Sequence, residues 1–464
     1  MTALWTAADF SQAIVPSLQP GGIGDVFGIS IDSRTVATGD AFFAIAGERF
    51  DGHDFARVAL DAGASVVVLE QSRQPDFSDL TERVVFVDDP LKGLELLGVA
   101  ARRRVAGKVI AVTGSVGKTS TKDALRAALA PSGKVHAAVS SFNNHWGVPL
   151  TLARMPRETD FGVFEIGMNH PGEIRHLVGM VAPDLAIITT VVAAHIGNFE
   201  SLDQIAAAKA EIFEGVVEGG AALINADNPY ADYLSGVARE NGIKTVMRFG
   251  RADDADIHLD GLTLGANGSD LSVSLMGDRL KCHLSAPGEH LAQNALAVLG
   301  AIRFVGGDIA KACAVLGSHG ATKGRGAQHR LSINGGSVLL TDESYNANPS
   351  SVAAALAVLG LHEGGGRKIA VLGDMLELGD DSADQHKALL GPLEAAGIDM
   401  VYLCGPMMAH LWEILPIAMR GTYAKASADL ITPLKASLRD GDTVMIKGSH
   451  GSKMGPVVMA LLKN

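Results

Sequence analysis

The sequence predicts an α/β protein with three domains, and three observations carry that prediction. Short apolar runs of strand length alternate along the chain with stretches of helical periodicity, which is typical of parallel sheets covered by helices. The chain has 464 residues, too many for a single hydrophobic core. Only 5% of the residues are aromatic while 54 are glycine, and this composition suits aliphatic cores with glycine-rich turns.

Residues 1–102 are predicted to form a small α/β domain. Its strand-like runs are 41–45 and 65–69, with a helical pattern at 55–62 between them. Gly63 is suited to end that helix, because glycine readily adopts the left-handed conformation at a helix C-terminus. The basic run at 102–104 and Gly107 indicate the passage into the next domain.

Residues 103–327 are predicted to form a mostly parallel sheet with helices on both faces. The expected strands are 109–113, 161–166, 185–192 and 221–225, with a helix at about 120–129. Shorter alternating segments at 255–285 predict an antiparallel excursion, and helices resume near His290.

Residues 328–464 are predicted to form a third α/β domain. The expected strands are 337–341, 368–372, 400–403 and 443–446, and the expected helices include 350–361 and 382–396.

Charge and cysteine content exclude several classes of protein. The net charge is −12 and no basic block exceeds residues 102–104, which argues against a duplex nucleic-acid partner. Cys282, Cys313 and Cys404 are scattered, so they indicate neither a disulfide framework nor a zinc site. We find no basic signal-peptide segment and no apolar run of about 18 residues, and we therefore expect a cytoplasmic protein without a membrane span.

The most informative motif lies between a buried strand and a helix. It reads Thr113-Gly114-Ser115-Val116-Gly117-Lys118-Thr119, followed by Ser120. Turn amides and a helix N-terminus can hold a polyphosphate, with Lys118 as a point charge and the Thr119 hydroxyl within reach of Mg²⁺. The common P-loop needs a glycine where Val112 stands, so this loop is shorter. The alternative interpretation is a tight turn with an incidental lysine.

Polar residues after the predicted central strands are further candidates, because ligands of open α/β sheets bind beyond the carboxyl ends of the strands. Glu165 is either a Mg²⁺ ligand or an exposed carboxylate. His195 is either a ligand or a structural histidine. Lys209 lies on a helix that begins with a capping-box pattern at Ser201, and a solvated lysine is the alternative there.

Other candidates lie in polar loops. Residues 140–149 form an asparagine-rich loop that either binds a ligand or only makes a turn. Arg325, at the predicted domain boundary, either covers a phosphoryl group or is a linker charge. Asn294 follows His290 on a helix. Asp342 ends a strand and begins a polar segment, 342–349, suited to the base and ribose of a nucleotide.

Additional motifs extend the pattern over nearly the whole chain. They are Ile31-Asp32-Ser33-Arg34, Gly39-Asp40-Ala41-Phe42-Phe43-Ala44, Asp51-Gly52-His53-Asp54-Phe55, the segment DESYNANPSS at 342–351 and the segment LGDMLELG at 372–379. Together with the loop at 113–119, they resemble the Mur ligase family, which builds the peptide of bacterial peptidoglycan, and within it the branch that adds D-alanyl-D-alanine.

The resemblance implies a three-domain Mur ligase architecture. It would comprise an N-terminal UDP-sugar-binding domain (1–102), a central P-loop parallel-sheet ATPase domain (103–327) and a C-terminal Rossmann-like ligase domain (328–464). The implied reaction is ATP-dependent ligation of D-alanyl-D-alanine to UDP-N-acetylmuramoyl-tripeptide through an acyl phosphate. The implied product is UDP-N-acetylmuramoyl-pentapeptide for peptidoglycan synthesis, made by a monomer without a nucleic-acid partner.

The resemblance also implies roles for individual residues. ATP would contact Thr113, Gly114, Ser115, Val116, Gly117, Lys118, Thr119, Ser120, Asn294, Arg325, Asp342, Tyr345 and Asn346. Two Mg²⁺ would be held by Thr119, Glu165, His195 and Lys209, with Lys209 carbamylated by CO₂. Catalytic roles would fall to Lys118, Lys209, His195 and Arg325. The UDP-sugar substrate would contact Ser33, Arg34, Gly47, Asp51, His53, Asn143, Asn144 and Gly147.

Two departures and three alternatives stay open. His450 and Gly455 stand where the family commonly has arginine and glutamate, so no role is transferred to them. One alternative is a sibling ligase that adds diaminopimelate or lysine, and the diaminopimelate-adding sibling typically carries a D-N-P-R motif, which this sequence lacks. The motifs at 32–34 and 51–55 argue against a folylpolyglutamate synthase. A nucleotide-switch ATPase without an amine acceptor is the alternative from another class of protein.

Overall fold

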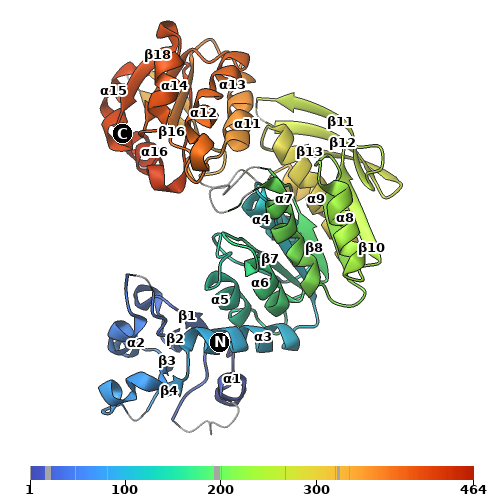
Figure 1. Cartoon of the computed structure of the whole chain (residues 1–464), viewed down its shortest axis with the longest axis vertical. Coiled ribbons are helices and arrows are strands. Elements are labelled where there is room, and N and C mark those ends of the chain that lie inside the picture. Colours follow the sequence, from blue (N-terminus) through green and yellow to red (C-terminus); the bar gives the residue numbers. More distant parts are fainter. Residues whose placement is uncertain are drawn as a thin grey trace.

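The computed structural model describes residues 2–463, except 16–21, 48, 81, 193–198, 200, 267, 319, 321–323 and 334. It contains three separate sheets of four, nine and six strands. These sheets follow one another along the long axis of the molecule in chain order (Figure 1). The predicted α/β class and three-domain architecture are confirmed, whereas the exact boundaries stay a prediction.

The N-terminal sheet is parallel, in the order β1-β2-β3-β4. Its strands are β1 (Gly28–Ser30), β2 (Asp40–Phe43), β3 (Val66–Glu70) and β4 (Val84–Val87). Its helices are α1 (Ala7–Ile14), α2 (Ala56–Asp61) and α3 (Pro90–Arg104), with 3₁₀ turns at Ser33–Thr35, Gly52–Phe55 and Gln71–Phe77. The helix predicted at 55–62 is thus confirmed as α2, and Gly63 follows it with φ +99°.

The central sheet has the order β13-β12-β11-β10-β9-β8-β5-β7-β6. Its strands are β5 (Lys108–Thr113), β6 (Val135–Ala137), β7 (Phe161–Glu165), β8 (Leu185–Ile188), β9 (Ala221–Asn225), β10 (Thr245–Gly250), β11 (Ile257–Gly265), β12 (Gly268–Leu275) and β13 (Asp278–Leu284). Its helices are α4 (Lys118–Leu129), α5 (Gly147–Ala153), α6 (Glu173–Val181), α7 (Leu202–Ala210), α8 (Ala231–Glu240), α9 (Glu289–Val305) and α10 (Ile309–Leu316), with 3₁₀ turns at Ala130–Ser132 and Glu211–Gly215. The antiparallel excursion is confirmed for β12 and β13, while β11 still pairs parallel with β10.

The strand predicted at 185–192 is too long, because β8 ends at Ile188. After one more backbone bond to β5, from the Thr189 amide to the carbonyl of Thr113 (3.0 Å), the next residues bond to the glycine-rich loop. The Thr189 hydroxyl donates to the carbonyl of Val116 (2.5 Å), and the Ser115 amide donates to the carbonyl of Thr190 (2.8 Å). The apolar run at 185–192 therefore serves two purposes, a strand and a support for the loop.

The C-terminal sheet has the order β14-β15-β19-β16-β17-β18 and is parallel except for the β14–β15 pair. Its strands are β14 (Ala327–Ile333), β15 (Gly336–Glu343), β16 (Lys368–Gly373), β17 (Met400–Cys404), β18 (Arg420–Ala424) and β19 (Thr443–Lys447). Its helices are α11 (Pro349–Gly360), α12 (Ser382–Lys387), α13 (Leu390–Ala395), α14 (Met408–Ile414), α15 (Ile431–Ser437) and α16 (Gly455–Leu462), with 3₁₀ turns at Gly379–Asp381, Ile417–Met419, Ser427–Leu430 and His450–Ser452.

The single helix predicted at 382–396 is wrong, since the segment forms α12 and α13 with a break between them. Pro392 lacks the amide that a continuous helix would need at that position, and proline is tolerated only in the first turn of a helix. Because of the break, Pro392 lies in the first turn of α13.

The first two sheets are joined by α3, which packs against both α1 and α5. The N-terminal core, which includes Phe10, Phe43 and Leu97, also contains Leu150 and Ala153 of α5. At the far end of α3, the Arg102 guanidinium donates to the carbonyls of Val181 and Ala182 and pairs with Asp184. Within the described part of the chain, no helix combines the length and apolar character that crossing a bilayer requires.

Candidate functional site

The predicted glycine-rich loop is a tight turn between β5 and α4. Gly114 has φ +149° and Gly117 has φ +87°, a region that favours glycine. Side chains could not replace them, because a Cβ on Gly114 would lie 1.9 Å from the Thr189 hydroxyl and one on Gly117 would lie 2.6 Å from the Asn294 amide oxygen. Asn294 on α9, far along the chain, is thus brought against the loop, while its contact with ATP stays a prediction.

Thr119, in the first turn of α4, meets two of the other predicted residues. Its hydroxyl donates to Glu165 Oε2 at 2.7 Å and accepts from Arg325 Nη2 at 3.0 Å. The second oxygen of Glu165 accepts from Asn143 Nδ2 at 2.7 Å. Glu165 is only 3% exposed, so the alternative of a solvent-exposed carboxylate is wrong. Residues from the loop, β7, the 140–149 segment and the domain boundary therefore converge on one point.

Two lysines lie near this point, Lys118 partly buried and Lys209 fully buried. Lys118 donates to the carbonyl of Gly114 at 2.7 Å. Burial lowers the pKa of Lys118, an effect that Glu165 opposes and Arg325 reinforces. Lys209, on α7, is 3% exposed, which makes the solvated-lysine alternative wrong. Burial, and then the positive charge of Lys118, lower the pKa of Lys209 well below its ordinary value.

The donor set at Thr119 suits a hard cation. A hydroxyl and a carboxylate oxygen lie together beside the lysine of the loop, and oxygen ligands of this kind are those that Mg²⁺ prefers. Among the described residues, no group of three or more His, Cys, Asp and Glu side chains forms a ready-made metal cluster. His195, the further predicted ligand, lies outside the described residues.

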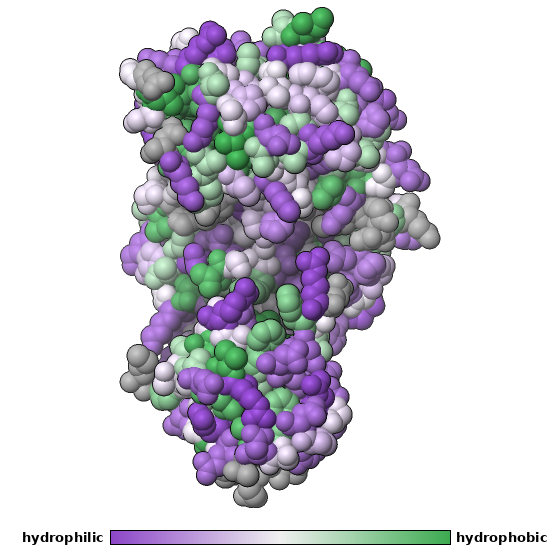
Figure 2. Space-filling view, turned by 90° about the vertical axis from the view of Figure 1, so that its left-hand side faces the viewer, coloured by the Kyte–Doolittle hydropathy of each residue, from purple (hydrophilic) through white to green (hydrophobic). Residues whose placement is uncertain are grey.

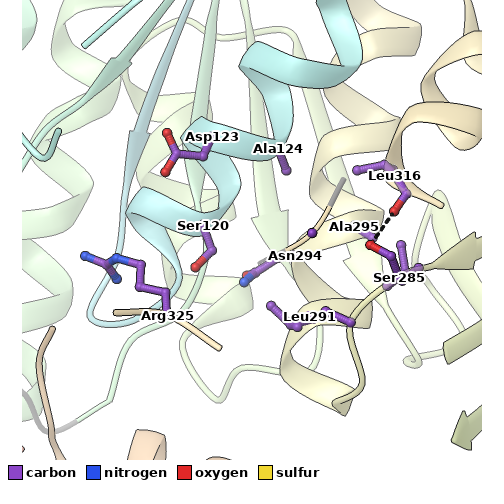
Figure 3. Close-up of a pocket in the computed structure, with 12 residues that line it drawn as sticks. Ser120, Asp123, Ala124, Ser285, Leu291, Asn294, Ala295, Leu316 and Arg325 are labelled. Carbon is purple, nitrogen blue, oxygen red and sulfur yellow. Dashed lines mark hydrogen bonds between the residues drawn. The ribbon is translucent and has the colours of Figure 1, made fainter. Parts of the chain in front are cut away.

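A cavity of about 90 Å³ opens beside the loop (Figure 3). Ser120 and Asp123 of α4, Asn294 of α9 and Arg325 bring polar groups to it, and Leu291, Ala295 and Leu316 line its apolar side. At the same level, the space-filling view has a hollow where the C-terminal domain meets the central one (Figure 2). Hydrophilic and hydrophobic residues are interspersed on this face.

Arg325 of the domain boundary and Tyr345 of the C-terminal domain also reach the site. The Arg325 guanidinium lies over the Tyr345 ring, 4.0 Å from its centre, and the Tyr345 hydroxyl hydrogen-bonds with the Ser141 hydroxyl. Asp342 is buried and accepts from the amides of Gly324 (2.9 Å) and Ser344 (3.1 Å), so it holds the turn that carries Arg325. Asn346 is exposed.

Comparisons with known proteins agree with this geometry. The Mur ligase family catalytic domain matches residues 25–103, the Mur ligase middle domain matches 112–302, and the Mur ligase glutamate ligase domain matches 329–450. The chain belongs to the Mur ligase family.

Relatives within the Mur ligase family match along almost the full length. The UDP-N-acetylmuramoyl-tripeptide–D-alanyl-D-alanine ligases of Escherichia coli and Rickettsia prowazekii are 34% and 33% identical to it, over 94% and 93% of this chain and 94% of each relative. A MurF crystal structure from Acinetobacter baumannii superposes with a TM-score of 0.86 at 28% identity, covering 99% of both chains. A MurF ligase from Thermotoga maritima in complex with ADP gives a TM-score of 0.79 at 26% identity, covering 94% of this chain and 97% of that one.

The residues predicted for the UDP-sugar of a Mur ligase lie in two groups. In the N-terminal group, Arg34 forms a bidentate pair with Asp32. Asp51 accepts from His53 Nδ1 (2.6 Å) and from Arg73 (2.8 Å). Because His53 Nε2 accepts the amide of Glu70, the proton of this buried ring is on Nδ1. Ser33 is the first residue of the 3₁₀ turn that contains Arg34.

The second group lies in the central domain. Asn144 accepts the amide of Gly147 at 2.9 Å and so begins α5, and a Cβ on Gly147 would lie 2.5 Å from the backbone of Phe142. These two residues have structural roles in the turn, whatever they bind. Gly47 of the N-terminal domain faces the Trp146 ring, since a Cβ on Gly47 would lie 3.3 Å from that ring, so the two groups border each other.

Two residues that contact the site were not predicted individually, Ser141, which lies in the candidate loop 140–149, and Lys122. Ser141 meets Tyr345, and Lys122 is fully buried on α4. A signal for Lys122 was present, because it lies one helical turn after Lys118 on a helix whose face must pack against the sheet.

Proposed function

We propose that this chain ligates D-alanyl-D-alanine to UDP-N-acetylmuramoyl-tripeptide at the expense of ATP. The observation that carries the proposal is the convergence of Asn143, Glu165, Arg325 and the phosphate loop on Thr119. The activities by which relatives of matching length are named support the choice of substrates, and the ADP in the Thermotoga maritima MurF structure supports the nucleotide.

The reaction makes an amide in two steps. An oxygen of the peptide carboxylate attacks the γ-phosphorus of ATP, which releases ADP and leaves an acyl phosphate. The amine of D-alanyl-D-alanine then attacks the acyl carbon and loses a proton, and inorganic phosphate leaves. The product, UDP-N-acetylmuramoyl-pentapeptide, serves peptidoglycan synthesis. Since the carboxylate and the γ-phosphate are both anionic, the protein must bring them together and offset their repulsion.

Lys118 and Arg325 provide the positive charge in this scheme. Lys118 lies in the loop that would hold the β- and γ-phosphates, and Arg325 reaches Thr119 from the domain boundary. The remaining ATP contacts are proposed for Thr113, Gly114, Ser115, Val116, Gly117, Ser120, Asn294, Asp342, Tyr345 and Asn346. Closure of the C-terminal domain would keep water away from the acyl phosphate.

Magnesium would be held by Thr119 and Glu165, with His195 and a carbamate on Lys209 as further ligands. When bound, it neutralises phosphate charge. The support for carbamylation is the burial of Lys209, because a lysine with a lowered pKa presents the neutral amine that reacts with CO₂. Two metal ions, a monomeric enzyme and the domain limits 1–102, 103–327 and 328–464 belong to the same proposal.

The UDP-muramoyl substrate would lie between the two groups of residues that border each other at Gly47 and Trp146. Asn143 is the member nearest to the chemistry, because it contacts Glu165 directly. The proposed contacts are Ser33, Arg34, Gly47, Asp51, His53, Asn143, Asn144 and Gly147.

The test is phosphate release with Mg²⁺, ATP and UDP-N-acetylmuramoyl-tripeptide, comparing D-alanyl-D-alanine with diaminopimelate, lysine and no amine. We expect release with D-alanyl-D-alanine alone. Release with another amine would assign the chain to a sibling activity, and equal release without an amine would indicate an ATPase.

A further inference from the structure

Lys122 is a buried cation that the proposed chemistry does not use. It lies on α4, one turn after Lys118, and its side chain is 0% exposed. Its ammonium donates to the carbonyls of Ala138 (2.8 Å) and Ser140 (3.2 Å) and forms an ion pair with Asp123 (2.9 Å). A buried ammonium is retained at a considerable desolvation cost, so its three contacts require an explanation.

Two of these partners are backbone carbonyls that lead into the segment with Asn143. Ser141, the next residue after Ser140, meets Tyr345, and Asn143 then meets Glu165. Glu165 in turn accepts from Thr119, on the same helix as Lys122. The contacts thus form a closed ring from α4 through the loop and back to α4.

The third partner, Asp123, faces the nucleotide side. It lines the cavity together with Ser120 and Arg325 (Figure 3). Lys122 therefore connects the loop proposed to contact the muramoyl-peptide, whose carbonyls it bonds directly, with Asp123, which lines the cavity beside the phosphate loop.

We propose that Lys122 is a positioning residue that fixes the 138–143 loop against the phosphate-loop helix and so sets where the carboxylate substrate lies relative to ATP. This inference rests on the proposed function and deepens it. Lys122 touches neither substrate, and its effect passes through Ser140 and Asn143. The loop is also held through the Ser141–Tyr345 and Asn143–Glu165 hydrogen bonds and by the Gly167 amide, which donates to the carbonyl of Asn143 (2.8 Å).

The experiment compares Lys122→Met with wild type by titration calorimetry. Methionine fits the apolar stem of lysine but cannot donate to the two carbonyls. We expect the Kd for UDP-N-acetylmuramoyl-tripeptide, measured with a nonhydrolysable ATP analogue present, to rise roughly tenfold or more, as expected for lost charge-assisted hydrogen bonds. The Kd for the analogue itself should change by less than about threefold.

The matched control is Lys108→Met. It removes the ion pair of Lys108 with Asp184 (2.8 Å) in the same domain, far in sequence from the loop. A merely structural role of Lys122 would lower the melting temperature and leave the ratio of the two Kd values as it is in wild type and in the control. That result would overturn the inference. A wild type that does not bind the UDP substrate would instead refute the proposed function itself.

If Lys122→Met does not fold, hydrogen exchange of the wild-type protein tests whether the 138–143 loop is coupled to the phosphate-loop helix. Binding of the ATP analogue should slow exchange of the amides at 138–143 by roughly threefold or more, because the loop is held by the helix that binds the phosphates. Exchange that does not respond to the analogue would overturn the inference.

Discussion

The phosphate loop and the N-terminal UDP-sugar motifs both stand out in the sequence, but they differ in where their partners lie. Thr119 contacts Glu165 and Arg325, which are 46 and 206 positions away in the chain. In the N-terminal motifs, Arg34 pairs with Asp32 and His53 with Asp51, each two positions away. The first motif assembles a site from distant segments, whereas the second completes its own turns and otherwise reaches only 17 and 22 positions along the chain, to Glu70 and Arg73. A motif of the second kind has a structural explanation even before any ligand is considered.

Among the predictions, Lys118→Ala should have the largest effect on the site that is assembled around the phosphate loop. We expect kcat to fall by roughly 10²–10³-fold, because one preorganised charge at the γ-phosphate is lost. The measurement is phosphate release with D-alanyl-D-alanine, with thermal unfolding as the control for an intact fold. Retained activity would remove the phosphate-loop interpretation.

Glu165→Gln tests the link between Thr119 and Asn143. The substitution keeps the shape of the side chain but removes its charge, so kcat/KM should fall by roughly 10–100-fold and the Mg²⁺ concentration for half-maximal activity should rise. Glu214→Gln, which changes a surface partner of Arg175, is the matched control. An unchanged Mg²⁺ dependence would contradict a metal role for Glu165.

Lys209→Met tests how much the burial of the Lys209 amine lowers the stability of the fold. Because the pKa of Lys209 is lowered in the fold, the unfolded chain binds more protons between the folded pKa and the ordinary value, and stability rises with pH in that interval. In CO₂-depleted buffer we expect the variant to be more stable by about 1–2 kcal/mol near pH 6, and the gain should vanish above the ordinary lysine pKa. Melting temperatures at pH 6 and above pH 10.5 check this. A pH-independent difference would contradict it.

Arg34→Ala tests the N-terminal UDP-sugar motifs and should have the smallest effect. The Arg34 side chain is 86% exposed, and exposed ion pairs contribute little, so we expect no measurable change in the melting temperature. The KM for the UDP substrate should rise by no more than about threefold. A tenfold rise would break the comparison, since Arg34 would then exchange Asp32 for the substrate.

What could be predicted from the sequence also depends on whether the residues concerned are neighbours in the chain or come together only in the fold. The loop at 113–119 was recognisable because its glycines, lysine and flanking strand and helix are contiguous. The burial of Lys209 and of Glu165 was not recognisable, because each depends on segments that come together only in the fold. The end of β8 was misjudged for a related reason: the Thr189 amide still bonds to Thr113 at the end of β5, but the Thr189 hydroxyl and the Thr190 carbonyl bond to the loop. The break between α12 and α13 was within reach, since Pro392 stands in the sequence.

The shared core at α3 and α5 has a consequence for the cooperativity of unfolding. Leu150 and Ala153 of the central domain pack among N-terminal residues, and Gly98 of α3 lies so close to Pro149 that a Cβ there would be 3.2 Å from its carbonyl oxygen. The C-terminal domain instead has cores of its own. Domains that share a core lose their structure together, so the first two should melt in one calorimetric transition and the third in another. The nucleotide is proposed to contact both the central and the C-terminal domain. Its binding should therefore bring the two melting transitions closer in temperature.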